Sequence, residues 1–244
     1  MEPVLVAANW KMYKDTVQTQ VYFGEWRDLA FPAGREAAFF PPFPLLPLVR
    51  DLLPQGQALG AQNCHEREEG AFTGEVSCAC LAGVGCTYVL VGHSERRHVF
   101  GEPDSRRAAK LQAALGSGLR PVLCVGETLE EREAGRTLEV VQRQLSAGLT
   151  TTPPRGGFDV AYEPVWAIGT GKVARCEDAA EVHGLIREWL GAQAVGQDAR
   201  VLYGGSVKPD NAAALLGTPG VQGLLVGGAS LEPRAFHAIL AAGA

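Results

Sequence analysis

The chain has no long hydrophobic run and no excess of basic residues. Its first apolar segment, Val4–Ala8, is too short for a signal peptide or a membrane span. The formal net charge of −5 argues against nucleic-acid binding, which would need clustered basic residues. These absences favour a soluble, cytoplasmic protein that binds neither a membrane nor nucleic acid.

The cysteines also lack a revealing pattern. No Cys-x-x-Cys pair is present, so neither a disulfide framework nor a zinc site is indicated. Metal binding by Cys78-x-Cys80 is disfavoured by the usual ligand spacings, and we expect no metal. We expect reduced thiols, with Cys124 buried in a strand. The six cysteines are Cys64, Cys78, Cys80, Cys86, Cys124 and Cys176.

Apolar runs typical of buried parallel strands recur along the whole chain. A length of 244 residues, 46% of them hydrophobic, can bury a large core, and no linker or low-complexity tract divides it. We therefore expect one domain over residues 1–244. The runs are Val4–Ala8, Ala37–Phe40, Ala58–Ala61, Tyr88–Val91, Val122–Val125, Val160–Tyr162, Val201–Tyr203 and Leu224–Val226.

Helix signals lie between these runs. Asp15-x-x-Gln18 and Thr128-x-x-Glu131 are typical of capping boxes. A helix ending at Gly191 is indicated by an apolar stripe of Val182, Leu185, Ile186, Trp189 and Leu190. Eight alternations of strand and helix predict an α/β fold, a parallel (β/α)8 barrel. A doubly wound sheet is the alternative, but Asn9-Trp10-Lys11 stands where its glycine-rich turn would be.

Polar residues or glycines follow five of the predicted strands. The active sites of such barrels lie at the carboxyl ends of the strands, so these groups should share one rim. The residues are Asn9 and Lys11, His93 and Glu95, Glu163, Gly204-Gly205-Ser206, and Gly227-Gly228.

Glu163 directly precedes a loop rich in proline, glycine and tryptophan. A lone Glu at a strand end is usually a solvated cap, but a glycine-tipped loop suits a hinged closure. We interpret Glu163 as a base beside a lid. The lid comprises Pro164, Val165, Trp166, Ala167, Ile168, Gly169, Thr170, Gly171, Lys172, Val173 and Ala174.

Glycine pairs follow the seventh and eighth predicted strands. They match the usual phosphate cradle of these barrels, in which backbone N–H groups and a short helix amino terminus bind the anion. Either pair alone could merely satisfy turn geometry. Together, at consecutive strand ends, they favour phosphate binding by Gly204, Gly205, Ser206, Gly227 and Gly228.

His93 and Lys11 could stabilise negative charge on a substrate oxygen. His93 precedes a predicted helix, whose dipole would disfavour an imidazolium. Lys11 could be a Schiff-base nucleophile, an electrostatic clamp or a surface charge. With a base and a phosphate cradle, these residues fit proton abstraction beside the carbonyl of a small phosphorylated sugar. Loop closure would protect the resulting enediolate from losing phosphate.

Five segments in order closely resemble the triosephosphate isomerase family, and the match runs from about Ala7 to Leu231. One segment could arise by chance, whereas five in the family's order are highly specific. The resemblance implies a TIM barrel. The segments are Asn9-Trp10-Lys11, Val91–Arg97, Ala161–Lys172, Tyr203–Val207 and Leu225–Ser230.

The resemblance implies interconversion of dihydroxyacetone phosphate and D-glyceraldehyde 3-phosphate, a step of glycolysis and gluconeogenesis, without cofactor or metal. Glu163 would shuttle the proton, His93 would be the neutral electrophile and Lys11 an electrostatic stabiliser, which disfavours the Schiff base. These tuned roles and the closing loop are familiar properties of the family. Asn9, Lys11, Gly169, Ser206, Gly227 and Gly228 would contact substrate or its phosphate, supported by Glu95 and Cys124.

The segment from Gly60 through Glu75 is similar to the family's third loop, which reaches into a neighbouring subunit. The resemblance therefore implies a homodimer, in which Thr73 would support Asn9 or Lys11 across the interface. An ordinary surface loop is the alternative, but it leaves an exposed Phe72 unexplained. The predicted dimer-loop residues are Gln62, Asn63, Phe72, Thr73 and Glu75.

Arg175-Cys176 and Gln222 depart from the family pattern. Arg175-Cys176 replaces a common Thr-Pro after the lid, which removes a side-chain cap and a proline. Glu177 or Asp178 would have to substitute at that helix start. Gln222 stands where an Asp commonly pairs with the arginine corresponding to Arg187, so here the contact should be a hydrogen bond to a neutral amide.

Two other functions stay open at this point. A Lys11-dependent aldolase on the same barrel would be trapped by borohydride with its substrate. A non-catalytic phosphate-binding barrel is disfavoured, because a degenerate copy should have lost at least one of Asn9, Lys11, His93 and Glu163.

Overall fold

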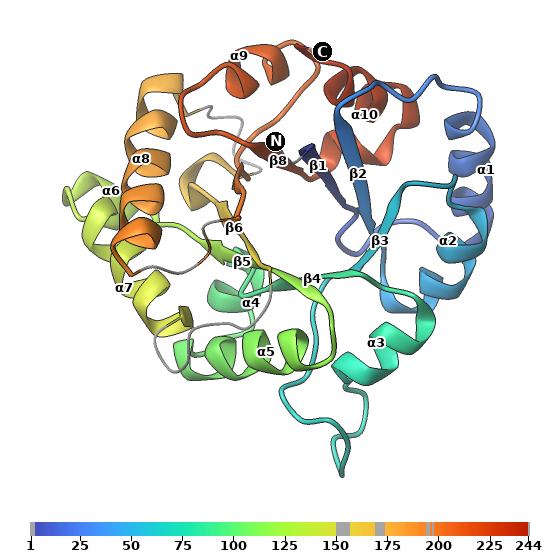
Figure 1. Cartoon of the computed structure of the whole chain (residues 1–244), viewed down its shortest axis with the longest axis horizontal. Helices are drawn as coiled ribbons and strands as arrows, with labels where there is room; N and C mark the ends of the chain where they lie inside the picture. The colour runs from blue at the N-terminus through green and yellow to red at the C-terminus, as the bar shows by residue number, and fades with distance from the viewer. Residues whose placement is uncertain (1–2, 150–156, 169–173, 194–195, 197, 244) are drawn as a thin grey trace.

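Eight parallel strands form a closed barrel at the centre of the molecule, with helices around its outside (Figure 1). This computed structural model describes residues 3–149, 157–168, 174–193, 196 and 198–243. The predicted (β/α)8 barrel is confirmed, with each strand paired to its sequence neighbours and β1 to β8. The strands are β1 (Val4–Asn9), β2 (Arg35–Phe40), β3 (Ala58–Ala61), β4 (Tyr88–Val91), β5 (Arg120–Val125), β6 (Asp159–Tyr162), β7 (Val201–Tyr203) and β8 (Gly223–Val226).

Helices follow the strands as the local signals predict. Both capping boxes form: the Asp15 carboxylate accepts from the Gln18 N–H at 2.8 Å, and the Thr128 hydroxyl accepts from the Glu131 N–H at 3.3 Å. The helix predicted to end at Gly191 continues to Ala192. The helices are α1 (Thr16–Trp26), α2 (Leu46–Leu52), α3 (Cys78–Val84), α4 (Ser94–His98), α5 (Asp104–Gly116), α6 (Leu129–Glu133), α7 (Thr137–Leu149), α8 (Cys176–Ala192), α9 (Ala212–Leu216) and α10 (Pro233–Leu240).

Short 3-10 turns complete the connections between these elements. They are η1 (Phe43–Leu45), η2 (Val165–Ala167) and η3 (Gly228–Leu231). Among the helices that the structure describes, none has the length and apolar character needed to cross a membrane.

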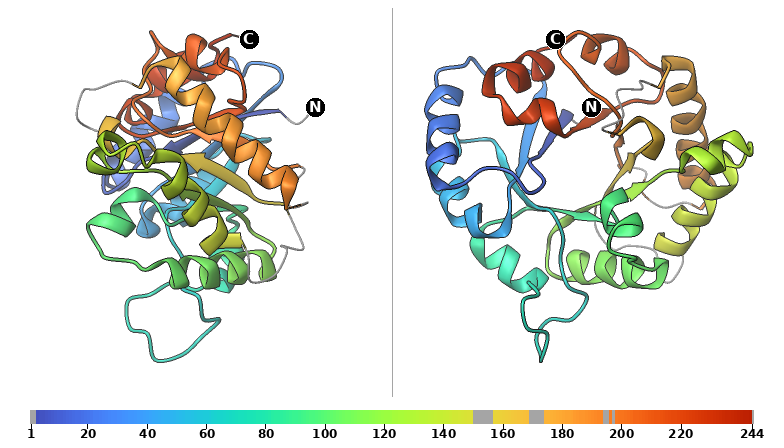
Figure 2. Two further views of the ribbon diagram at one scale, coloured as in Figure 1. Left: turned by 90° about the vertical axis from the view of Figure 1, so that its left-hand side faces the viewer. Right: turned by 180° about the vertical axis from the view of Figure 1, so that it is seen from behind.

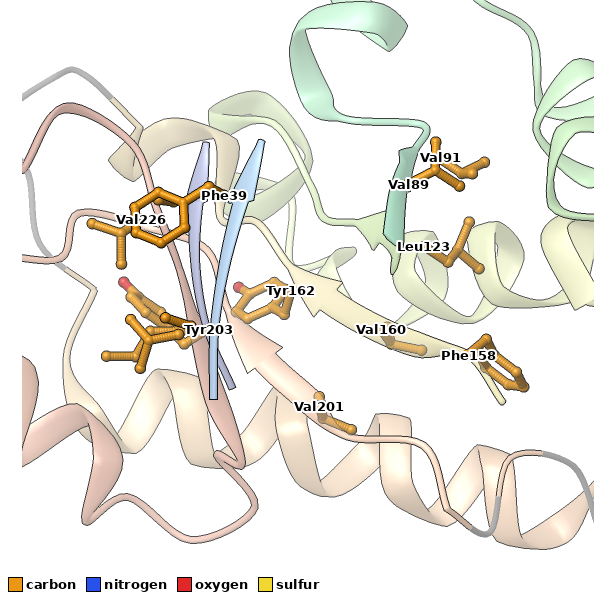
Figure 3. Close-up of a cluster of buried hydrophobic side chains, with 14 of the residues drawn as sticks. Phe39, Val89, Val91, Leu123, Phe158, Val160, Tyr162, Val201, Tyr203 and Val226 are labelled. Carbon is orange, nitrogen blue, oxygen red and sulfur yellow. The ribbon is translucent and has the colours of Figure 1, made fainter. Parts of the chain in front are cut away.

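Alternating strand residues build two separate cores. One cluster joins strand side chains to those of the helices, and Figure 3 shows part of it, including Phe39 and Tyr203. The other draws only on strand residues, such as Ala7, Cys124 and Ala161, and fills the barrel interior. Because side chains alternate along a strand, residues two positions beyond an interior residue also face inward.

The segment between β3 and α3, residues 62–77, projects away from the barrel (Figure 2). Its two arms are joined near the base, where the His65 N–H donates to the Val76 oxygen at 2.8 Å. Phe72 of this segment is 44% exposed, and its ring lies 4.2 Å from the His65 ring, centroid to centroid. We refer to this segment as the β3–α3 loop.

Candidate active site

A cavity of about 510 Å³ lies at the carboxyl end of the barrel. The interior alternation points Asn9 and Glu163 into it, because they follow Ala7 and Ala161 by two residues. The described residues predicted for catalysis or phosphate binding all line this cavity: Asn9, Lys11, His93, Glu163, Ser206, Gly227 and Gly228. Ile168 of the predicted lid also lines it, as do Tyr13 and Lys208, for which no role was predicted. Gly169 lies outside the described residues.

The Glu163 carboxylate is 1% exposed and has two donors. Oε2 accepts from the Ser94 N–H at 2.8 Å, and Oε1 lies 2.9 Å from His93 Nε2. Burial alone would raise the pKa of Glu163, but the contacts with His93 and Ser94 and the nearby Arg97 outweigh burial and lower it. The carboxylate is therefore held as an anion in a nearly dry site.

The His93 ring is oriented by the start of α4. Its Nδ1 accepts from the Glu95 N–H at 3.2 Å, so Nδ1 carries no proton in this arrangement. The proton of a neutral ring then lies on Nε2, which faces Glu163. A neutral His93 is thus able to donate a hydrogen bond at the cavity wall.

Lys11 is fixed on three sides. Its ammonium lies 2.6 Å from Glu95 Oε1, and its N–H donates to Asn9 Oδ1 at 3.0 Å. Its backbone has φ 51°, an uncommon conformation for a non-glycine residue. The Gln62 amide donates to the Lys11 oxygen at 2.8 Å and to the Phe40 oxygen at 2.8 Å, which helps to hold this conformation. The sequence placed Gln62 only in the dimer loop and gave no sign of this second contact.

Two glycines make room for Glu163. A Cβ at Gly126 would lie 1.8 Å from the Glu163 backbone oxygen, and one at Gly204 would lie 3.0 Å from the Glu163 Cγ. Gly126 also has φ 158°, which other residues rarely adopt. The sequence indicated Gly204 only as part of the phosphate lining, because no motif shows its approach to Glu163.

The predicted phosphate loops line the same cavity, and Gly227 approaches Lys11. A Cβ at Gly227 would lie 3.5 Å from Lys11 Cε, and the 3-10 turn η3 begins at Gly228. The first N–H groups of such a turn have no partner inside it, which leaves them able to bind an anion. In the loop after β7, the Ser206 backbone oxygen accepts a hydrogen bond from the Asn211 side-chain amide at 3.0 Å. This bond helps to hold the loop in place.

Arg97 contacts the backbone beneath Glu163, and the sequence did not predict this role. Its Nη2 donates to the Cys124 oxygen at 2.6 Å and to the Gly92 oxygen at 3.2 Å. These contacts join the ends of β4 and β5 beneath Glu163. The pair Arg96-Arg97 was visible in the sequence, but the inward direction of Arg97 depends on the turn after β4.

The amino-terminal end of the predicted lid is anchored by Glu127. The Trp166 indole N–H donates to Glu127 Oε1 at 2.8 Å, and the Arg132 guanidinium lies 4.5 Å from the Trp166 ring centroid. Residues 169–173 of the predicted lid lie outside the described residues. No motif distinguished Glu127 or Arg132 in the sequence beyond the neighbouring capping box.

The carboxyl-terminal end of the predicted lid is anchored by Asp178 rather than Glu177. The Asp178 carboxylate accepts from the Arg175 N–H at 3.3 Å and from the Arg175 side chain at 2.9 Å. Arg132 also contacts Asp178, at 3.1 Å. Asp178 therefore caps the start of α8 where the family's Thr-Pro is missing, and Arg132 contacts the anchors of both lid ends.

The predicted contact at the other departure is confirmed. Arg187 Nη1 donates to Gln222 Oε1 at 2.6 Å, and the Val201 N–H donates to the same oxygen at 3.2 Å. Gln222 thus satisfies the arginine with a neutral amide. Among the described side chains, no cluster of His, Cys, Asp and Glu is arranged to hold a metal ion.

Comparison with known proteins agrees with this geometry. Residues 4–243 match the family model described as triosephosphate isomerase. A triosephosphate isomerase of Thermus thermophilus is 48% identical over 246 residues, covering 98% of both chains. One from Aquifex aeolicus is 48% identical, covering 97% of this chain and 98% of the relative. The chain belongs to the triosephosphate isomerase family.

Proposed function

We propose that this chain interconverts dihydroxyacetone phosphate and D-glyceraldehyde 3-phosphate, in glycolysis and gluconeogenesis, with Glu163 as the base. Family membership assigns the aldose-ketose isomerase activity. The observation that carries the residue assignment is the buried Glu163 carboxylate, 2.9 Å from His93 Nε2 in the cavity that Lys11 and the glycine loops also line.

The arrangement supports a proton shuttle between adjacent carbons. Glu163 takes the proton from one carbon beside the carbonyl and returns it to the other. Charge develops on oxygen in the enediolate between these steps, and His93 and Lys11 are the donors that meet it. One such oriented donor in a dry site contributes about 3 kcal/mol to the barrier.

Substrate binding must free Glu163 from its present partners. The contacts with His93 and Ser94 lower the pKa of the carboxylate, which makes it a weak base. If substrate oxygens take over the His93 contact, Glu163 loses a stabilising donor while it stays buried. Its pKa then rises, so the base gains strength only when substrate is present.

The phosphate would be bound by backbone N–H groups at Ser206, Gly227 and Gly228, with Gly169 added by the lid. Asn9 and Lys11 would contact the reacting end of the substrate. The ion pair between Lys11 and Glu95 favours an electrostatic role over a Schiff base, because an amine nucleophile needs a free lone pair. Glu95 positions Lys11, and Cys124 fills the barrel beneath the base.

A coupled assay of triose phosphate interconversion tests the assignment of the base. Glu163→Asp withdraws the carboxylate by one methylene, so turnover should fall by roughly a hundredfold or more. Inhibition by inorganic phosphate should be nearly unchanged. Glu177→Asp, at an exposed position, is the matched control and should keep full turnover. Equal turnover of Glu163→Asp and wild type would refute the assignment.

A homodimer through the β3–α3 loop is part of this proposal. A second cavity of about 210 Å³ lies beside Lys11 and is lined by Met12, Phe43 and Phe100. Phe100 is 66% exposed, and Phe72 of the β3–α3 loop is also exposed. The loop of a second copy, carrying Thr73 and Glu75, suits this cavity and would cover both apolar surfaces.

Sedimentation at micromolar concentration tests the dimer. Phe72→Asp should give a monomer, whereas Phe31→Asp, at a similarly exposed phenylalanine in the loop before β2, should stay dimeric. A dimer that survives Phe72→Asp would exclude this interface. We further infer a cytoplasmic location, since all six cysteines are free thiols and suit a reducing compartment.

A further inference from the structure

Cys64 and Cys78 lie on either side of the base of the β3–α3 loop. Cys64 follows β3 in the chain, and Cys78 is the first residue of α3. Between them the two arms run side by side, because His65 donates to Val76 at 2.8 Å and bridges to Ser77. Backbone contacts therefore hold the two ends of the loop together at its base.

The two thiols face one another in a buried space. Cys64 is 1% and Cys78 2% exposed, and their side chains hydrogen-bond to each other. Cys64 Sγ also lies 4.0 Å from the Lys110 oxygen, and Cys78 Sγ lies 3.9 Å from the His65 oxygen. Backbone oxygens from α5 and from the β3–α3 loop thus contact the two sulfurs.

The contact between the two side chains shifts the pKa values of the two thiols in opposite directions. The hydrogen bond from Cys64 lowers the pKa of the Cys78 thiol and raises that of Cys64, and the positive charge of Lys110 favours both thiolates. Cys86 differs, because burial raises the pKa of its thiol to about 12. Within the pair, Cys78 is the nucleophile and Cys64 the resolving thiol.

We propose that Cys64 and Cys78 form a redox pair that hydrogen peroxide oxidises to a disulfide across the base of the β3–α3 loop. Neither residue belongs to the catalytic or phosphate-binding set, so the pair is separate from the proposed active site. Peroxide is small enough to enter where a larger oxidant could not, which suits thiols as buried as these.

The chemistry balances with one peroxide. The Cys78 thiolate attacks one peroxide oxygen, the O–O bond breaks, and the departing hydroxide takes up the proton released from Cys78. Cys78 is now a sulfenic acid. Cys64 attacks its sulfur as the S–O bond breaks, and the proton of Cys64 leaves with the hydroxyl as water. Two thiols and one peroxide become one disulfide and two waters.

The disulfide would restrain the loop in the unfolded as well as the folded protein. A bond across a loop of about 15 residues typically removes enough unfolded-state entropy to raise the melting temperature by about 5–10 °C in a protein of this size. Cleavage of the loop by proteases should also slow, because its base can no longer open.

Peroxide treatment of the native protein tests the proposal. Mass spectrometry should show the loss of two hydrogen atoms and, after non-reducing digestion, a peptide joining Cys64 to Cys78. The melting temperature should rise by about 5–10 °C and return after reduction. Oxygen added to the exposed Cys80 without a joined peptide would overturn the proposal.

Three variants sharpen the result. Cys78→Ser should lose both the joined peptide and the thermal shift, whereas Cys86→Ser and Cys80→Ser should keep both. Retention in Cys80→Ser shows that the exposed thiol does not relay the oxidation. Because Cys78→Ser alters a buried site, circular dichroism should first establish its folding. If it does not fold, the joined peptide in wild type alone decides.

Discussion

The two ends of the barrel both bury charged side chains but hold them differently. At the amino end, Arg200 lies 2.8 Å from Asp159 and 2.6 Å from Glu36, in a network of opposite full charges. At the carboxyl end, the partners of Glu163 are His93 and one backbone N–H. The first arrangement is closed on itself, whereas the second adjoins an open cavity.

The amino-end network joins five strand starts that are far apart in the chain. Arg120 pairs with Asp159 at 2.8 Å, and the Tyr88 hydroxyl accepts from Arg200 at 2.8 Å while it donates to Glu36 at 2.6 Å. Breaking one partner of a buried pair leaves an uncompensated charge and typically costs about 3–5 kcal/mol. This network therefore contributes to stability, and its described charges lie opposite one another in ion pairs.

At the carboxyl end, the buried charge of Glu163 can exchange its partners. Glu163 can leave His93 for a substrate at the loss of hydrogen bonds to one neutral side chain and one N–H. The glycines at positions 126 and 204 leave room around the carboxylate. The comparison indicates that changes at this end should alter the reaction more than the stability, and changes at the other end the reverse.

The largest effect should come from removing the fixed cation. Lys11→Met keeps the length of the side chain but removes the ammonium, so kcat/KM should fall by about a thousandfold. The melting temperature should change by only a few degrees, because Lys11 pairs with a partly exposed Glu95. Steady-state kinetics and thermal melting measure both. Activity within tenfold of wild type would remove Lys11 from the proposed mechanism.

At the amino end, the opposite result is expected. Asp159→Asn removes the charge between Arg120 and Arg200, so the free energy of unfolding should fall by about 3–5 kcal/mol. The turnover of the folded fraction should stay near wild type. Asp210→Asn, at an exposed carboxylate, is the control and should leave the urea midpoint in place. A stable Asp159→Asn variant with low turnover would contradict the expectation that the amino end serves stability and the carboxyl end serves the reaction.

Acid should weaken the amino-end network selectively. Burial alone would raise the pKa of Asp159, but hydrogen bonds and charge from Arg120 and Arg200 outweigh it and lower the pKa below 3.8. A lowered folded pKa stabilises the protein fully above 3.8, and this contribution is lost as the pH falls through the folded value. Unfolding measured across that range should show a steeper loss in wild type than in Asp159→Asn. Parallel curves would contradict the coupling.

The sequence revealed one end of the barrel far better than the other. Strand runs and short motifs located Asn9, His93 and Glu163, because each follows a strand and all such ends meet at one rim. The amino-end network had no motif. Glu36 and Arg200 lie 164 positions apart, and only the strand register brings them together. The strand register also decides how closely Gly126 approaches the Glu163 backbone, so this approach was not predictable from the sequence.

A smaller effect is expected at Gln222, just before β8. Gln222→Asp would place a carboxylate against the exposed Arg187 guanidinium, an ion pair that contributes about 0.2–1 kcal/mol. The melting temperature should shift by roughly 1–3 °C. High salt should reduce the shift if it arises from charge. An unchanged melting temperature would show that the neutral amide of Gln222 stabilises the contact with Arg187 as much as a carboxylate would.

The smallest effect should come from the far end of the lid. Replacing Arg175-Cys176 with Thr-Pro removes the guanidinium contact to Asp178 and restores a side-chain cap and a proline that favours the first helical turn. Asp178 then keeps Arg132 as its charged partner. The hinge should still close, but the opening and closing rates should change by a small factor while the barrel's stability stays constant. Relaxation-dispersion NMR of Trp166 measures these rates, and identical rates in the two proteins would show that Asp178 already fixes this hinge as well as Thr-Pro would.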